Sequence, residues 1–96
     1  MLLQALVAGA GVTISSVATN RGIDVTGVVK AEGDLDFRGT MGVDREAPVG
    51  FSAIRLSFEL ESASSHEDLD ALIRATERYC VVYQTLVHPP EMGISR

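Results

Sequence analysis

The chain has 96 residues, 46% of them apolar, and 13 acidic against 8 basic side chains give it a net charge of −5. This length suits one domain, and the composition is that of a globular rather than a disordered protein. Because no cluster of Lys and Arg is present to neutralise phosphates, nucleic acid is not expected as a partner.

The first segment, residues 2–21, predicts a long helix that is apolar on nearly every side. No Lys or Arg precedes it, and Gln4 and several hydroxyl side chains interrupt it. We therefore interpret it as a buried central helix rather than a signal peptide or membrane span, and expect no membrane partner. Arg21 suits the last turn, and Gly22 suits the left-handed position that ends a helix.

Residues 23–39 alternate between two kinds of side chain, which is typical of a half-buried strand. Every odd position from 23 to 37 is apolar or glycine, and the even positions are mostly charged or polar. We expect a bend near Gly27 or Gly33, because glycine inside a strand often marks one. The next stretch, residues 39–48, contains glycine and proline and predicts a loop.

A second alternating stretch spans residues 49–61, with apolar side chains at the even positions from Ile54 onward. Phe51 is out of phase with them, which predicts a bulge or bend before Ile54. The two strands can pair antiparallel and, together with two helices, indicate the α+β class. Two strands are a thin sheet for two apolar helices, so we expect another chain or segment to complete the fold.

The C-terminal part predicts a second helix, which begins after one of the serines at 64–65. Each serine has an acidic residue three positions later, as in a capping box. One face of this helix includes Tyr79, Cys80 and Tyr83, and the helix cannot continue through Pro89.

Cys80 is the only cysteine, so no internal disulfide can form and the sequence favours a cytoplasmic location. From the residues alone it is either a small apolar core residue or a reactive thiol, and a nearby helix C-terminus disfavours the thiolate. We expect Tyr79 and Tyr83 to pack beside it and, together with Glu77, to line any substrate groove. Glu77 either accepts a hydrogen bond near the thiol or lies on an exposed helix face. The two histidines have no further ligand at metal spacing, so neither a metal nor another cofactor is expected.

Three stretches cover nearly the whole chain: LLQALVAGAGVTISSVATNRGI, GDLDFRGTMGVDREAPVGFSAIRLSFELES and LIRATERYCVVYQTL. They resemble the OsmC/Ohr family of thiol-dependent peroxidases (osmotically inducible protein C and organic hydroperoxide resistance proteins), and the third stretch is the most specific. The resemblance implies a single OsmC-like domain over residues 1–96, with long central helices packed against an antiparallel sheet in an intertwined homodimer.

The resemblance also implies a reaction, the reduction of organic hydroperoxides in the oxidative stress response. A first cysteine attacks the peroxide and becomes a sulfenic acid, and a second condenses with it into a disulfide that an external dithiol reduces. Cys80 matches the second, resolving cysteine, whereas the position of the first, peroxidatic cysteine falls on Gly9. The strand-rich segment that the family carries ahead of the central helix is expected to be missing here.

With one thiol, sustained turnover is not expected of this chain, because the chemistry needs two thiols within disulfide reach. Three hypotheses stay open. The first is a family peroxidase, and the second is a non-catalytic OsmC-like dimer that serves as a binding or structural module. The third is an unrelated protein that binds small apolar ligands.

Overall fold

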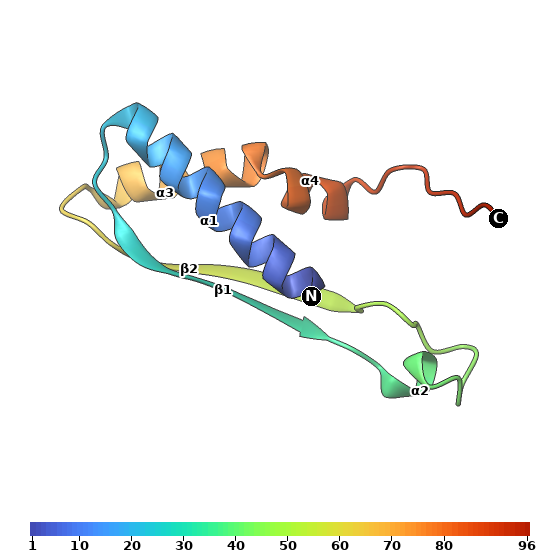
Figure 1. Cartoon of the computed structure of the whole chain (residues 1–96). Coiled ribbons are helices and arrows are strands. Elements are labelled where there is room, and N and C mark those ends of the chain that lie inside the picture. The colour runs from blue at the N-terminus through green and yellow to red at the C-terminus, as the bar shows by residue number, and fades with distance from the viewer.

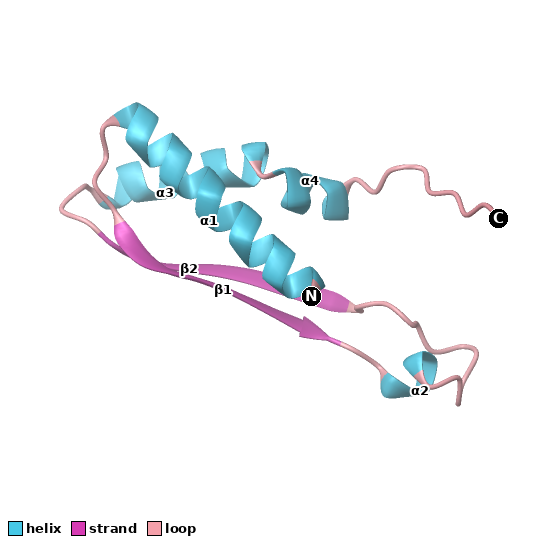
Figure 2. Ribbon diagram, viewed as in Figure 1, coloured by secondary structure: helices cyan, strands magenta, loops and turns pink.

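A computed structural model describes residues 1–96 as helices that cover one face of a two-stranded antiparallel sheet (Figure 1). The secondary structure is shown by colour in Figure 2. In chain order the elements are α1 (Leu2–Arg21), β1 (Thr26–Asp34), α2 (Phe37–Thr40), β2 (Ala53–Glu61), α3 (His66–Tyr79) and α4 (Val81–Val87). The predicted α+β class is confirmed.

Helix α1 has the predicted bounds. It ends at Arg21 because Gly22 adopts the left-handed conformation (φ 68°, ψ 26°) that closes a helix. Its length and mean hydropathy of 1.6 would also suit a membrane span, but core helices of globular domains share these features. Here one side of α1 packs against α3, α4 and β1. The helix was expected to be buried on nearly every side, but Val12, which lies on a different side of α1, is 68% exposed. The buried residues recur at one-turn spacing: Leu6, Ala10, Ile14 and Ala18.

Strands β1 and β2 pair in an antiparallel register that places Val29 opposite Phe58. Exposed and half-buried residues alternate along both strands, as the period of two predicts. The outer face carries ion pairs such as that between Lys30 and Glu59, whose Nζ and Oε1 atoms are 2.9 Å apart. Exposed pairs of this kind contribute little to stability, so the sheet depends on its inner, helix-covered face.

The first strand is shorter than the predicted 23–39, because β1 ends at Asp34 and the single helical turn α2 follows. Asp36 starts that turn: its carboxylate accepts the backbone N–H of Arg38 at 3.0 Å and the guanidinium of Arg38 at 2.7 Å. These local hydrogen bonds compete with strand pairing and redirect the chain.

The predicted bend is present at Ser52, just before β2 begins at Ala53, and Phe51 therefore precedes the strand and is not part of a bulge. The Phe51 ring lies over Gly33, where an added Cβ would come within 2.6 Å of two ring carbons. The glycine thus makes room for an aromatic ring. The expected bend in β1 does not interrupt its pairing with β2, which is continuous from Thr26 to Asp34.

Helix α3 has the predicted cap, since the Ser65 hydroxyl accepts the backbone N–H of Asp68 at 3.2 Å. The helix was expected to continue through Cys80, and this prediction is wrong. Cys80 is extended (φ −74°, ψ 112°), so α3 ends at Tyr79 and α4 starts at Val81. After this break α4 contacts α1 as well as α3.

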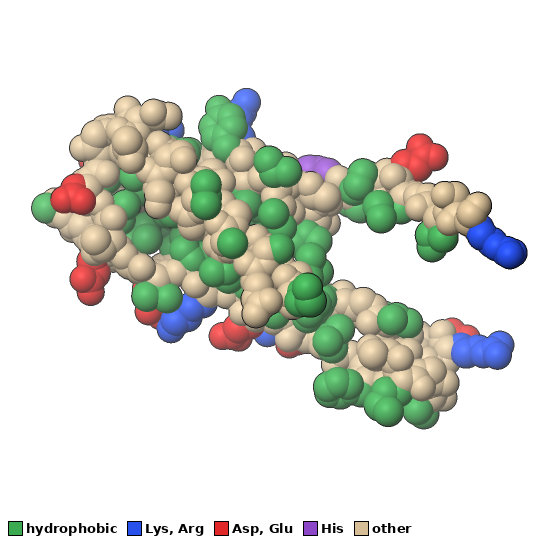
Figure 3. Space-filling model, in the orientation of Figure 1, with side chains coloured by type: hydrophobic (Ala, Val, Ile, Leu, Met, Phe, Trp, Pro, Cys, Tyr) green, Lys and Arg blue, Asp and Glu red, His purple; other side chains and the backbone are tan.

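The core lies between α1, α3 and the sheet, but it is small. Ile14, Ala18 and Leu72 form its centre, and only 10 of the 96 residues are buried. The radius of gyration is 16.5 Å, against about 12–13 Å for a compact chain of this length. The hairpin tip around α2 projects from the body, and Figure 3 shows hydrophobic side chains gathered there. Its large exposed apolar residues are Leu35, Phe37, Met41, Val43 and Val49.

We predict that Leu72→Ala lowers the free energy of unfolding by about 2–5 kcal/mol, because it leaves a cavity where a fully buried side chain packs between α1 and β2. Ile94→Ala is the control, since that side chain is fully exposed outside the core and the hairpin tip, and its loss costs less than about 1 kcal/mol. Urea denaturation at one fixed protein concentration measures both. Equal losses for the two variants would contradict this core.

Candidate functional site

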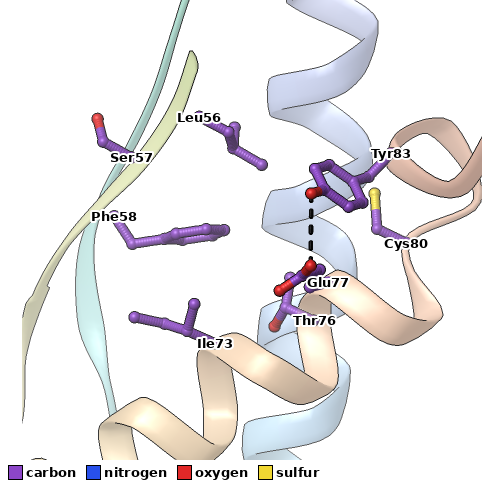
Figure 4. Close-up of a pocket in the computed structure, with 8 residues that line it drawn as sticks. All are labelled: Leu56, Ser57, Phe58, Ile73, Thr76, Glu77, Cys80 and Tyr83. Atoms are coloured by element: carbon purple, nitrogen blue, oxygen red, sulfur yellow. Dashed lines mark hydrogen bonds between the residues drawn. The ribbon is translucent and has the colours of Figure 1, made fainter. Parts of the chain in front are cut away.

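A pocket of about 300 Å³ lies between β2 and the junction of α3 with α4 (Figure 4). Its wall is mostly apolar and contains a single thiol and a single carboxylate. Strand β2 contributes inward-facing side chains, and α3 contributes its apolar face. The lining residues are Leu56, Ser57, Phe58, Ile73, Thr76, Glu77, Cys80 and Tyr83.

Cys80 is a free cysteine that is 1% exposed, and its backbone is held from both sides. Its N–H donates to the carbonyl of Thr76, and its own carbonyl accepts the N–H of Gln84, each at 2.9 Å. Cys80 therefore caps the C-terminus of α3 and also precedes the first turn of α4. The thiol is held in place by two helices.

The structure brings residue 9 next to this thiol, although the two lie near opposite ends of the chain. A Cβ built at Gly9 would lie 3.5 Å from the Cys80 Sγ and 3.1 Å from the Val82 Cγ2. A sulfur on that Cβ could reach the S–S bond length of about 2.0 Å through ordinary side-chain rotation. The methyl group of Val82 would have to move by a few tenths of an ångström. Positions 9 and 80 thus have the proximity that disulfide formation requires.

Tyr83 and Glu77 face each other across the pocket wall. The Tyr83 hydroxyl donates a long hydrogen bond, 3.4 Å, to the Glu77 carboxylate. Burial of the phenol, the negative charge of Glu77 and this hydrogen bond together raise the pKa of Tyr83 above its usual value. Tyr83 therefore presents a protonated hydroxyl to the pocket at neutral pH.

Tyr79, which we expected to pack beside Cys80, lies outside the pocket, and its side chain is 62% exposed. The guanidinium carbon of Arg78 lies 5.6 Å from the centre of its ring. The expectation assumed a continuous helix, whereas α3 ends at Tyr79 and the chain turns at Cys80. No group of three or more His, Cys, Asp or Glu side chains is placed to hold a metal ion.

A second apolar pocket, of about 470 Å³, adjoins the first and shares Leu56 and Tyr83 with it. It lies between the first turns of α1, the start of β2 and the end of α4, and nine of its eleven lining residues are hydrophobic. Together the two pockets offer an extended apolar surface that leads from the thiol towards the end of α4.

The family model described as OsmC-like protein matches residues 1–95. The chain belongs to the OsmC family. A crystal structure of an OsmC like protein from Mycoplasma pneumoniae is similar, with a TM-score of 0.77 at 22% sequence identity. The match covers 92% of this chain and 60% of the other, so this OsmC-family chain spans less than two thirds of that protein's length. No curated protein matches the chain.

In this OsmC-family chain, the positions of several site residues were predicted from the sequence, and the position of one was not. Leu56 and Phe58 were expected to face inward from their period of two, and Ile73 belongs to the predicted apolar face of the helix. Val82, which contacts the position of Gly9, was missed. No sequence signal marks it, because its contact exists only once the chain turns at Cys80.

We predict that Tyr83 ionises at a higher pH than an exposed tyrosine and that Glu77→Gln lowers its pKa, because the variant removes a negative charge that opposes the phenolate. Ultraviolet titration at alkaline pH measures this in a Tyr79→Phe background, where Tyr83 is the only remaining tyrosine. An unchanged midpoint in Glu77→Gln would show that the carboxylate does not act on the phenol.

Proposed function

We propose that this chain carries an incomplete two-thiol site for organic hydroperoxides, with Cys80 as the resolving-type thiol and Gly9 at the position of the absent peroxidatic thiol. The observation that supports this most is the 3.5 Å between a Cβ at residue 9 and the Cys80 Sγ. The apolar pocket beside the thiol and membership of the OsmC family agree with it.

In a complete site, a thiolate at residue 9 attacks the peroxide oxygen of ROOH, the O–O bond breaks, and ROH leaves after taking up a proton. The sulfur becomes a sulfenic acid, which the Cys80 thiol attacks with loss of water to form a disulfide. A dithiol then reduces the disulfide and restores both thiols. The present chain has no sulfur at residue 9, so its remaining thiol is open to a single oxidation or to a link with another chain.

A non-catalytic binding or structural module is the second candidate, and Gly9 itself favours it. The chain retains both apolar pockets, of about 300 and 470 Å³, without the sulfur that would react with their contents. Such a protein would bind apolar molecules through the same surface that a peroxidase uses for its substrate.

We also propose that the protein is a homodimer and, since its one cysteine is a free thiol, that it is cytoplasmic. A chain with 10 buried residues and an extended shape leaves much apolar surface uncovered. The uncovered surface includes one side of α1 and the hairpin tip, which are suited to a second copy.

Gly9→Cys is expected to create peroxidase activity in a chain that lacks it. With tert-butyl hydroperoxide and dithiothreitol, the variant consumes many equivalents of peroxide per chain, whereas the unchanged protein is expected to consume peroxide far more slowly, because its one thiol belongs to a residue that is 1% exposed and has no peroxidatic partner. Without reductant, the variant forms a disulfide between residues 9 and 80, which mass spectrometry of peptides detects.

Two further variants test the geometry. Gly11→Cys is the matched control, because residue 11 is on the same helix but nothing lies within 4 Å of its Cβ position. It is expected to form no disulfide with Cys80 and to show no turnover. Adding Cys80→Ser to Gly9→Cys removes the disulfide between residues 9 and 80 and is expected to slow turnover, because the dithiol must then reduce the sulfenic acid directly. Turnover by the unchanged chain, or equal activity of both glycine variants, would contradict the proposal.

Sedimentation equilibrium is expected to give a mass about twice the 10.2 kDa of the chain, because association covers apolar surface that the single chain leaves exposed. Phe37→Ser removes a 70% exposed aromatic side chain from the hairpin tip and is expected to weaken association without unfolding the chain. A monomer mass across the accessible concentration range would exclude the homodimer.

A further inference from the structure

We propose that Glu77 selects the ligands of the Cys80 pocket by charge, so that uncharged and cationic molecules enter and anionic ones are disfavoured. Glu77 is the only charged side chain in the pocket wall, and no Lys, Arg or His lines either this pocket or the adjoining one. The identity of the ligand as an organic hydroperoxide rests on the proposed function, whereas the selection by charge is a property of the pocket.

Glu77 is an exposed residue at the rim of the pocket, and two hydrogen bonds connect it to α4. Its carboxylate accepts the Tyr83 hydroxyl at 3.4 Å, and its backbone carbonyl accepts the side-chain amide of Gln84 at 2.7 Å. Both donors belong to α4, so the bonds cross the junction at which Cys80 lies. Figure 4 shows the Glu77 carboxylate at the hydroxyl end of the Tyr83 ring and the Cys80 sulfur beside that ring.

The charge of Glu77 has no counter-ion. All five ion pairs of the chain involve other residues, and these lie on β1, β2 and the hairpin tip. The neighbouring Arg78 lies over the Tyr79 ring, outside the pocket. A single uncompensated charge beside an apolar wall changes the local concentration of a charged ligand several-fold, although solvent at the exposed rim screens it.

The consequence is a preference among hydroperoxides of similar size. An alkyl or ester hydroperoxide places its apolar part against Leu56 and Phe58 without meeting a like charge. A molecule with a carboxylate close to its peroxide group meets the Glu77 carboxylate at the wall, and no cation in either pocket offsets the repulsion. Glu77 is therefore assigned as a specificity-determining residue that need not take part in bond breaking.

The test uses Cys80 as a reporter, because it is the only cysteine. Two methanethiosulfonates of similar size, one with an aminoethyl and one with a sulfonatoethyl group, each form a mixed disulfide with the thiol and release methanesulfinate. The two rate constants with Cys80 give one ratio, and the two rate constants with 2-mercaptoethanol give a second. The first ratio divided by the second measures the charge preference at the thiol. This ratio cancels any effect of a substitution on the reactivity of the thiol itself.

Glu77→Gln is expected to reduce the preference for the cationic reagent by roughly threefold to tenfold at low salt. Glu67→Gln is the matched control, since it removes the same charge from α3 about 15 Å further along the helix axis. In about 0.1 M salt, where the screening length is about 10 Å, Glu67→Gln is expected to change the ratio by less than about 1.5-fold, and Glu77→Gln by clearly more. An unchanged ratio in Glu77→Gln, or an equal change in Glu67→Gln, would overturn the assignment.

The unchanged protein provides a second readout if circular dichroism shows that Glu77→Gln does not fold. Its preference for the cationic reagent is expected to fall towards that of 2-mercaptoethanol as salt is added. A preference already equal to that of the free thiol at low salt would also overturn the assignment. Neither measurement uses a peroxide, so failure of the hydroperoxide proposal and failure of the charge selection are distinguishable.

Discussion

The close approach of the α3–α4 junction to α1 determines the site. The contact is at residue 9, where a Cβ would lie 3.1 Å from the Val82 Cγ2 and 3.5 Å from the sulfur of Cys80. The extended backbone of Cys80 directs α4 towards α1. The thiol is enclosed at this junction, and Cys80 is only 1% exposed. The burial of the thiol and its proximity to residue 9 are consequences of the same contact.

A second constraint is that the fold has one covered face. The helices cover the inner side of a two-stranded sheet, and the outer side carries exposed ion pairs. One side of α1 and the projecting hairpin tip stay open, which accounts for the low number of buried residues in a chain that is nearly half apolar. The residues of this chain that line the pockets beside Cys80 include inward-facing side chains of β2 and residues of the helices that cover it.

The candidate site was predictable in part. The alternation of β2 indicated that Leu56 and Phe58 face inward, and the resemblance to the OsmC/Ohr family singled out residues 9 and 80. Residue 9 does lie beside the thiol. Tyr79 was assigned to the groove because its position was extrapolated along a continuous helix, and the break at Cys80 moves it to the surface. The position of Glu77, held on the wall by donors from α4, was left open by the sequence because those donors come from the far side of the break.

The sequence by itself determined the features that depend on neighbouring residues: the helix that ends at Gly22, the serine cap at Ser65, and the two alternating strands. Their hydrogen bonds and periodicities join residues a few positions apart, so the order of residue types is sufficient to predict them. Only the tertiary structure decided where the last helix breaks and that residues 9 and 80 meet. These depend on packing between elements distant in the chain, where the shape of each surface, more than its local pattern, decides which side chains come into contact.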